Sequence, residues 1–266
     1  MNNAAQMREA RKHYRLGDIV RSEWTKFASL RSSRWTLIVF AVTGVGLGIL
    51  ISALTGARWP HASAETRANW DPTNNTLAGL IPGYLAIPVL GVLMVTSEYT
   101  SGSIRSTLAA VPRRPLVLAA KAIVFAGATL VVVEAVSFAA FLLGQQVMGT
   151  APHAGLDQPG VLRALILSGV FLVLMGLFGL GVGAIIRRSG AAVAAYAGVA
   201  VVLPSLLGAF PGDLWRFGPI TILANSVGAV RILPGALSPW TGFAAMAAYT
   251  AVALAVGTVL LVRRDA

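Results

Sequence analysis

Six long apolar runs alternate with shorter polar segments along this chain. Each run is about 20 residues long, which is the length that an α-helix needs to cross roughly 30 Å of hydrocarbon. Glu134 is the only acidic or basic residue inside them. The pattern predicts an all-α integral membrane protein with six transmembrane helices, at residues 35–57, 77–96, 122–144, 164–186, 191–210 and 240–262.

A further helical pattern precedes the first run. Its apolar side chains recur at helical spacing and form one stripe: Leu16, Ile19, Val20, Trp24, Phe27 and Leu30. Much of its polar surface is basic: Arg21, Lys26, Arg31 and Arg34. A basic amphipathic helix of this kind lies in the membrane interface, held by buried apolar area and anionic lipid. This helix could serve only to fix the membrane topology. Alternatively, it could also act as an elbow helix that docks a cytoplasmic partner.

The segment "SEYTSGSIRSTLAAVPRRP" follows the second run. Gly102 allows a turn, Ser103 can cap a helix, and Ile104–Ala110 has room for about two helical turns before Pro112 ends them. The next helix then begins near Pro115, which suits a first helical turn. The sequence therefore predicts a short helix between the second and third spans.

The short helix has a small apolar face, formed by Ile104 and Leu108 at i and i+4, with Arg105 beside it. Such a helix, set crosswise to the spans, fits a cleft in a soluble partner. The alternative is a solvated loop whose arginines only enforce the topology.

Composition supports the membrane class and the charge sets the orientation. Only 12% of the 266 residues are charged, and the mean hydropathy is +0.74, which excludes an ordinary soluble domain. Of the 21 Lys and Arg residues, 16 fall on the side of both termini, so we expect both termini in the cytoplasm. The net charge of +11 therefore reflects topology, and no nucleic-acid partner is expected. Residues 1–34 form a cytoplasmic tail with the amphipathic helix, and residues 35–266 form the transmembrane domain.

The chain lacks the residues that most catalytic chemistry requires. It has no cysteine, and His13, His61 and His153 lie far apart, so we expect no metal site. Its three lysines do not form the glycine-rich motif that cradles phosphates, and no hydrolase or zinc-protease motif is present. We expect no cofactor and no enzymatic activity on this chain, so its energy must come from a partner or an ion gradient.

Glu134 is an exception within the third span. A charge at mid-membrane costs at least about 2.5 kcal/mol, so this side chain should face the helix bundle or be protonated. It is either a proton or substrate site or a partner in an interhelical hydrogen bond.

Three Gly-x-x-x-Gly pairs indicate a tightly packed bundle and only suggest a dimer. They are Gly44 with Gly48, Gly79 with Gly83, and Gly179 with Gly183.

Three segments, "RSEWTKFASLRSSRW", "SEYTSGSIRSTLAAVPRRPLVLAAK" and "LVRRDA", resemble the permease subunits of type-2 ABC exporters in the form common in high-GC bacteria. The similarity covers nearly the whole chain, in order and spacing. It implies a multi-pass protein of the bacterial cytoplasmic membrane that forms a half-channel and pairs with a second copy or a paralogue. A separate cytoplasmic ATPase subunit would hold ATP and Mg and dock at a coupling helix near residues 98–111.

The resemblance also implies roles for particular residues. The coupling element would contain Glu98, Tyr99, Gly102, Ile104, Arg105 and Leu108. The elbow helix would contain Arg21, Glu23, Trp24 and Lys26. Residues 211–239 would form a re-entrant segment before the last span. The expected function is export of a drug, lipid or peptide-like substrate; the alternatives are a gradient-driven transporter that uses Glu134 and a non-transporting membrane scaffold.

Overall fold

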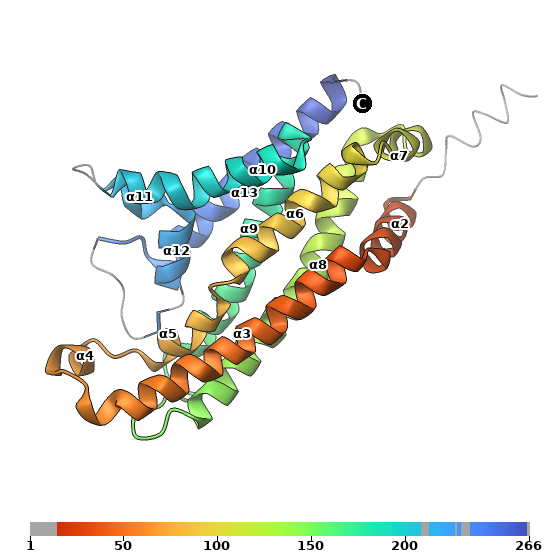
Figure 1. The fold of residues 1–266 in the computed structure, drawn as a ribbon. Coiled ribbons are helices and arrows are strands. Elements are labelled where there is room, and N and C mark those ends of the chain that lie inside the picture. Colours follow the sequence, from red (N-terminus) through yellow and green to blue (C-terminus); the bar gives the residue numbers. More distant parts are fainter. Residues whose placement is uncertain (1–14, 209–212, 227, 230–234, 265–266) are drawn as a thin grey trace, which may run out of the picture.

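The computed structural model describes residues 15–208, 213–226, 228–229 and 235–264 (Figure 1). The described residues are 83% helical and contain no strand. Six helical segments are long and apolar enough to cross a membrane. The predicted all-helical class and the six segments long and apolar enough to span a membrane are therefore confirmed for the described residues. The predictions for residues 1–14, 209–212, 227, 230–234 and 265–266 lie outside the described residues.

The described residues form sixteen helical elements. In chain order they are α2 (Leu16–Ser29), α3 (Arg31–Arg58), η1 (Trp59–His61), α4 (Ala64–Ala68), α5 (Pro72–Leu77), η2 (Ala78–Leu80), α6 (Gly83–Thr100), α7 (Ile104–Ala110), α8 (Arg114–Gln146), α9 (Val161–Ile186), α10 (Ser189–Ala197), the π-helical turn η3 (Gly198–Val202), α11 (Leu203–Leu207), η4 (Leu214–Phe217), α12 (Pro219–Ser226) and α13 (Pro239–Arg263).

The second span is not one continuous helix. Asp71 caps α5 by accepting hydrogen bonds from the amides of Thr73 and Asn74, and the chain then passes through η2 before α6 begins after Pro82. Pro82 has no amide hydrogen to donate, and it stands at the N-cap of α6, where no intrahelical hydrogen bond from that position is lost. The apolar segment is therefore longer than the predicted 77–96 and is assembled from three pieces.

The third span extends well beyond the predicted 122–144. Helix α8 has 33 residues with a proline in its first turn, as the sequence predicted. At 1.5 Å per residue it is about 50 Å long, more than the hydrocarbon layer requires. Its first turns therefore project past the apolar layer, where they meet α2 and α7.

The fifth span is the least regular. Arg187, with φ of 64°, ends α9, and α10 begins two residues later, so the two helices are joined by a tight turn. The π-helical turn η3 then separates α10 from α11. Such turns insert one residue into the helix and are frequent at functional sites.

Both described ends of the chain lie at the same end of the bundle. A guanidinium nitrogen of Arg114 donates to the carbonyl of Leu261 at 3.0 Å, and one of Arg187 donates to the carbonyl of Leu260 at 2.9 Å. These bonds bring the start of α8 and the ends of α9 and α13 together. Helices α2 and α7 lie at this end, and α4 lies at the opposite end (Figure 1). The placement of this end in the cytoplasm stays a prediction.

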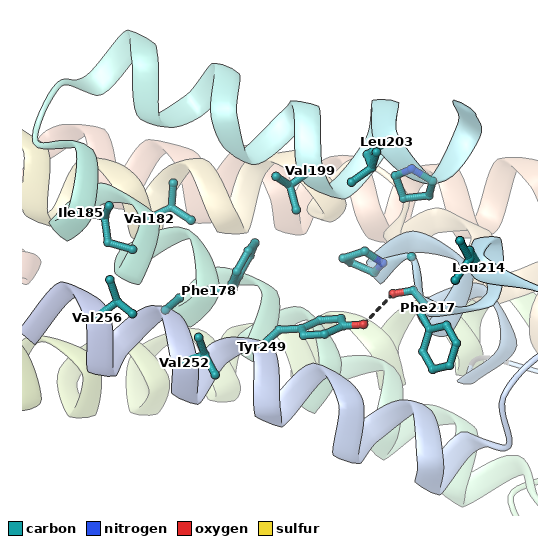
Figure 2. Close-up of a pocket in the computed structure, with 14 residues that line it drawn as sticks. Phe178, Val182, Ile185, Val199, Leu203, Leu214, Phe217, Tyr249, Val252 and Val256 are labelled. Atoms are coloured by element: carbon teal, nitrogen blue, oxygen red, sulfur yellow. Dashed lines mark hydrogen bonds between the residues drawn. The ribbon is translucent and has the colours of Figure 1, made fainter. Parts of the chain in front are cut away.

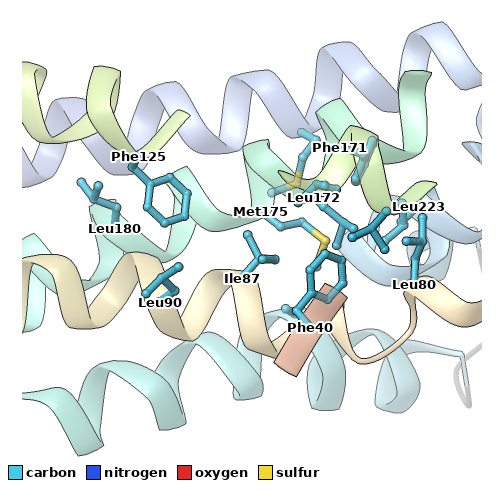
Figure 3. Packing of buried hydrophobic residues seen from close by; sticks show 14 of the residues in the cluster. Phe40, Leu80, Ile87, Leu90, Phe125, Phe171, Leu172, Met175, Leu180 and Leu223 are labelled. Carbon is cyan, nitrogen blue, oxygen red and sulfur yellow. The ribbon is translucent and has the colours of Figure 1, made fainter. Parts of the chain in front are cut away.

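The core lies between α6, α8 and α9. Figure 3 shows Ile87, Phe125 and Met175 packed between these helices, and each of the three is buried. All three predicted Gly-x-x-x-Gly pairs pack inside the chain, because their Cα atoms face Phe40, Val136, Ala140, Pro88, Val92 or one another. The pairs therefore serve the bundle itself and leave no Gly-x-x-x-Gly surface for a second copy.

The region before the last span contains the short helix α12, which packs against α9 and α13. The side chain of Ile222 fills the space beside Gly242, and the amide of Asn225 donates to the carbonyl of Leu237. An eight-residue helix is too short to cross a membrane, as expected from the sequence. That it re-enters the membrane stays a prediction.

Candidate functional site

Helix α2 presents two different apolar faces. Ile19 and Phe27 are buried against the bundle at 4% and 5% exposure, whereas Trp24 is 51% exposed. The predicted single stripe is therefore divided: one part packs on the protein, chiefly on α8, and the other, with Leu16 and Leu30, faces outward. A helix held on one side by protein and carrying an exposed tryptophan on the other suits the membrane interface.

A buried cluster of four charges joins α2 to the rest of the molecule. The Lys121 Nζ lies 2.7 Å from Glu23 Oε2 and 2.7 Å from Glu98 Oε1. The Lys26 Nζ lies 2.7 Å from Glu23 Oε1 and 3.0 Å from Glu98 Oε1, and it donates to Thr107 Oγ1 at 3.1 Å. We call Glu23, Lys26, Glu98 and Lys121 the four-charge cluster. It is electrically neutral and connects α2, α6, α7 and α8.

The four-charge cluster is buried at Lys121 and partly exposed at Lys26. The side chains of Glu23 and Lys121 are 2% and 3% exposed, whereas that of Lys26 is 38% exposed. Burial acts to lower the pKa of Lys26, but its hydrogen bonds and charge pairs with Glu23 and Glu98 outweigh burial and raise the pKa above its usual value. Glu98 Oε2 is buried without a hydrogen-bond partner among the described residues. Buried charges of this kind are stable only while every partner is present.

The predicted short helix between the second and third spans is confirmed as α7. Gly102, with φ of 73°, makes the turn before it, and Ser103 occupies the position ahead of its first residue. The Ser103 hydroxyl does not cap α7, because it pairs with the hydroxyl of Ser101 at 2.9 Å. Ile104 is 4% exposed, so it anchors α7 to the bundle.

The outward surface of α7 differs from the predicted one. The predicted apolar pair of Ile104 and Leu108 faces the protein, with Leu108 half-buried against the core. The exposed residues of α7 are Arg105, Ser106, Ala109 and Ala110. A soluble partner would therefore meet a small-residue surface with one arginine, because the apolar pair is already occupied.

The structure brings together Glu23 and Lys26 of the predicted elbow helix and Glu98 of the predicted coupling element. Arg21, Trp24 and Arg105 are exposed, and Tyr99 lies under the guanidinium of Arg187 at 5.1 Å. Sequence reasoning missed Lys121 and Thr107. One signal was present: Glu23 lies four residues after Ile19 and four before Phe27, on the buried face, where a lone carboxylate requires a cation.

Glu134 lies far from the four-charge cluster. It follows Lys121 by 13 residues on α8, a separation of about 20 Å along the helix. Both of its carboxyl oxygens are buried without a hydrogen-bond partner among the described residues. The carboxyl group rests directly against Gly169 of α9, where any side chain would displace it. The predicted interhelical hydrogen bond of Glu134 is absent from the described part of the chain.

An apolar cavity of about 530 Å³ lies between α9, α13 and the segment from η3 to α12 (Figure 2). Phe178, Val252 and Val256 form part of its wall, and the Tyr249 hydroxyl donates to the carbonyl of Phe217 at 3.1 Å. No group of three or more His, Cys, Asp or Glu side chains gathers at a metal-binding distance among the described residues.

No protein-family model matches this chain, and no curated protein matches it.

Proposed function

We propose that this chain is the transmembrane permease subunit of a bacterial ABC exporter, driven by a separate cytoplasmic ATPase that docks on α7. The four-charge cluster carries the proposal. It ties the short helix α7 to α2, α6 and α8 through Lys26 and Thr107, while the outer surface of α7 stays exposed. A push on α7 would therefore reach the second and third spans together.

The proposed energy source follows from a nucleotide-binding motif that the sequence lacks. Because no phosphate-cradling motif is present in the sequence, ATP and Mg would bind the partner subunit. The chain would pair with a second copy or a paralogue to complete a pathway. The apolar cavity beside Phe178 and Tyr249 suits the apolar part of a drug-like, lipid or peptide-like substrate.

Reversing the charge of the α7 surface tests the docking site. We expect Arg105→Glu combined with Ala109→Glu to lower co-purification of the ATPase encoded nearest to this chain by about tenfold or more, because rim charges govern association. ATP hydrolysis by the purified complex should fall in parallel. Both residues are exposed, so the variant should insert and fold normally.

Arg58→Glu is the matched control. Arg58 is also exposed, but it is the last residue of α3 and so lies at the end of the bundle away from α7. It should co-purify with the ATPase like the wild type. Substituting Ile104 is a poorer test, since its burial means that loss of binding would also follow from local unfolding. Normal ATPase binding by the α7 variant would rule out this docking surface, and binding without any transport would favour a membrane scaffold.

A gradient-driven transporter is the second candidate, supported by the two unpartnered carboxyl oxygens of Glu134. The two functions differ in the behaviour of Glu134→Gln, which removes the titratable group and keeps the shape. For an ATP-driven exporter we expect unchanged ATP hydrolysis and unchanged export of amphipathic dyes from cells. Loss of dye export by a chain that purifies without an ATPase would transfer the assignment to proton coupling.

A further inference from the structure

Exposed side chains in the first turns of α3 surround a small surface cavity that is basic at one end and apolar at the other. Arg31, Arg34, Trp35 and Ile38 line a space of about 280 Å³. They stand at i, i+3, i+4 and i+7, so they share one face of the helix. This face is separate from the α7 surface and from the four-charge cluster.

The polar end of this cavity is strongly cationic. Among the described residues neither Arg31 nor Arg34 has an ion-pair partner, and Arg34 makes only a long contact, 3.5 Å, to the carbonyl of Ser29. Leu30 precedes the helix and offers no side-chain cap, so the first-turn amides of this 28-residue helix lack a side-chain acceptor. Two exposed guanidinium groups without an ion-pair partner among the described residues, beside a helix N-terminus, favour the binding of an anion.

The same face becomes apolar toward the membrane. Trp35 is 64% exposed, Ile38 51% and Val42 68%, and each lies one turn farther along α3. A tryptophan between basic and aliphatic side chains marks the depth at which lipid headgroups give way to acyl chains. The sequence of basic, aromatic and aliphatic side chains along α3 therefore matches a single molecule that has an anionic head and an apolar tail.

We propose that this face of α3 binds an anionic phospholipid, with its phosphate between Arg31 and Arg34 and an acyl chain along Ile38 and Val42. The site fixes the break between α2 and α3 at the membrane surface. It holds for any substrate and any energy source, so its test is independent of the proposed function.

Native mass spectrometry of the full chain tests the site. The protein is released from nanodiscs that contain equal amounts of phosphatidylglycerol and phosphatidylcholine with identical acyl chains. We expect wild-type protein to retain phosphatidylglycerol preferentially. Basic residues near an anionic surface contribute about fivefold each, so Arg31→Gln combined with Arg34→Gln should lower this preference about 25-fold.

Arg58→Gln is the control, because it removes an equivalent exposed charge from the other end of α3, next to Trp59. It should retain phosphatidylglycerol like the wild type. Titration of the detergent-solubilised protein with inorganic phosphate separates a lipid site from a simple phosphate site, and we expect no saturable binding below millimolar concentrations. An unchanged lipid preference in the double variant, an equal loss in the Arg58→Gln control, or tight binding of phosphate alone would overturn the proposal.

Discussion

Replacing Lys121 with methionine is expected to lower the free energy of unfolding by about 3 to 5 kcal/mol. The change leaves the buried carboxylates of Glu23 and Glu98 facing only Lys26, whose side chain is 38% exposed. Methionine keeps the unbranched shape and all but the terminal atom of the side chain, so the loss reflects mainly the missing charged group. The measurement is unfolding in mixed micelles with increasing SDS, followed by loss of helix and tertiary signals.

Two companion variants isolate the cause. Lys26→Met removes a cation of the same cluster that water already reaches, so its loss should be smaller. Glu98→Gln combined with Lys121→Met removes one buried charge of each sign and should regain part of the stability lost in Lys121→Met. Equal losses for Lys26→Met and Lys121→Met would contradict the central position of Lys121.

Gly91→Ala is the second change for which we expect a large effect, a loss of about 1 to 3 kcal/mol, with Gly91→Val losing more. A Cβ atom at Gly91 would overlap the carbonyl oxygen of Gly176, where α6 packs directly on α9. That neighbour is backbone, so it cannot move away by a change of rotamer. The two helices would have to separate, and the core around Ile87 and Met175 would loosen with them.

Gly127→Ala provides the matched control in the same SDS titration. Gly127 also lies inside a spanning helix, but a Cβ there would meet no atom within 4 Å. Alanine favours the helix over glycine by up to about 1 kcal/mol, so this variant should be neutral or slightly more stable. Similar losses at Gly91 and Gly127 would show that the loss at Gly91 does not arise from its contact with α9.

The number of long apolar helical segments could be predicted because the bilayer imposes a length on each apolar run. The helix ends could not. Helix α8 extends past the predicted 122–144 because its first turns are stabilised by α2 and by the four-charge cluster. Pro82 was visible in the sequence, yet only the packing of η2 beside α3 shows that the second span is built from separate pieces.

The candidate site was predictable in its parts and not in its arrangement. The turn at Gly102 and the bounds of α7 followed from local residue chemistry, since glycine permits the left-handed backbone and Pro112 cannot continue a helix. The direction in which Ile104 points depends on the surface beneath it. Its burial exposes Arg105 and so changes which residues a partner would meet.

The sequence by itself determined that the chain is helical and that six segments suit a membrane. It also determined that an amphipathic helix precedes them and that a short helix lies between the second and the third. These properties depend on length, periodicity and local backbone chemistry, which neighbours in the chain control. Tertiary structure alone decided that Lys121 lies between Glu23 and Glu98, and that Gly91 faces Gly176. Such contacts join residues far apart in the sequence, and only the packing of one helix on another selects which of them meet.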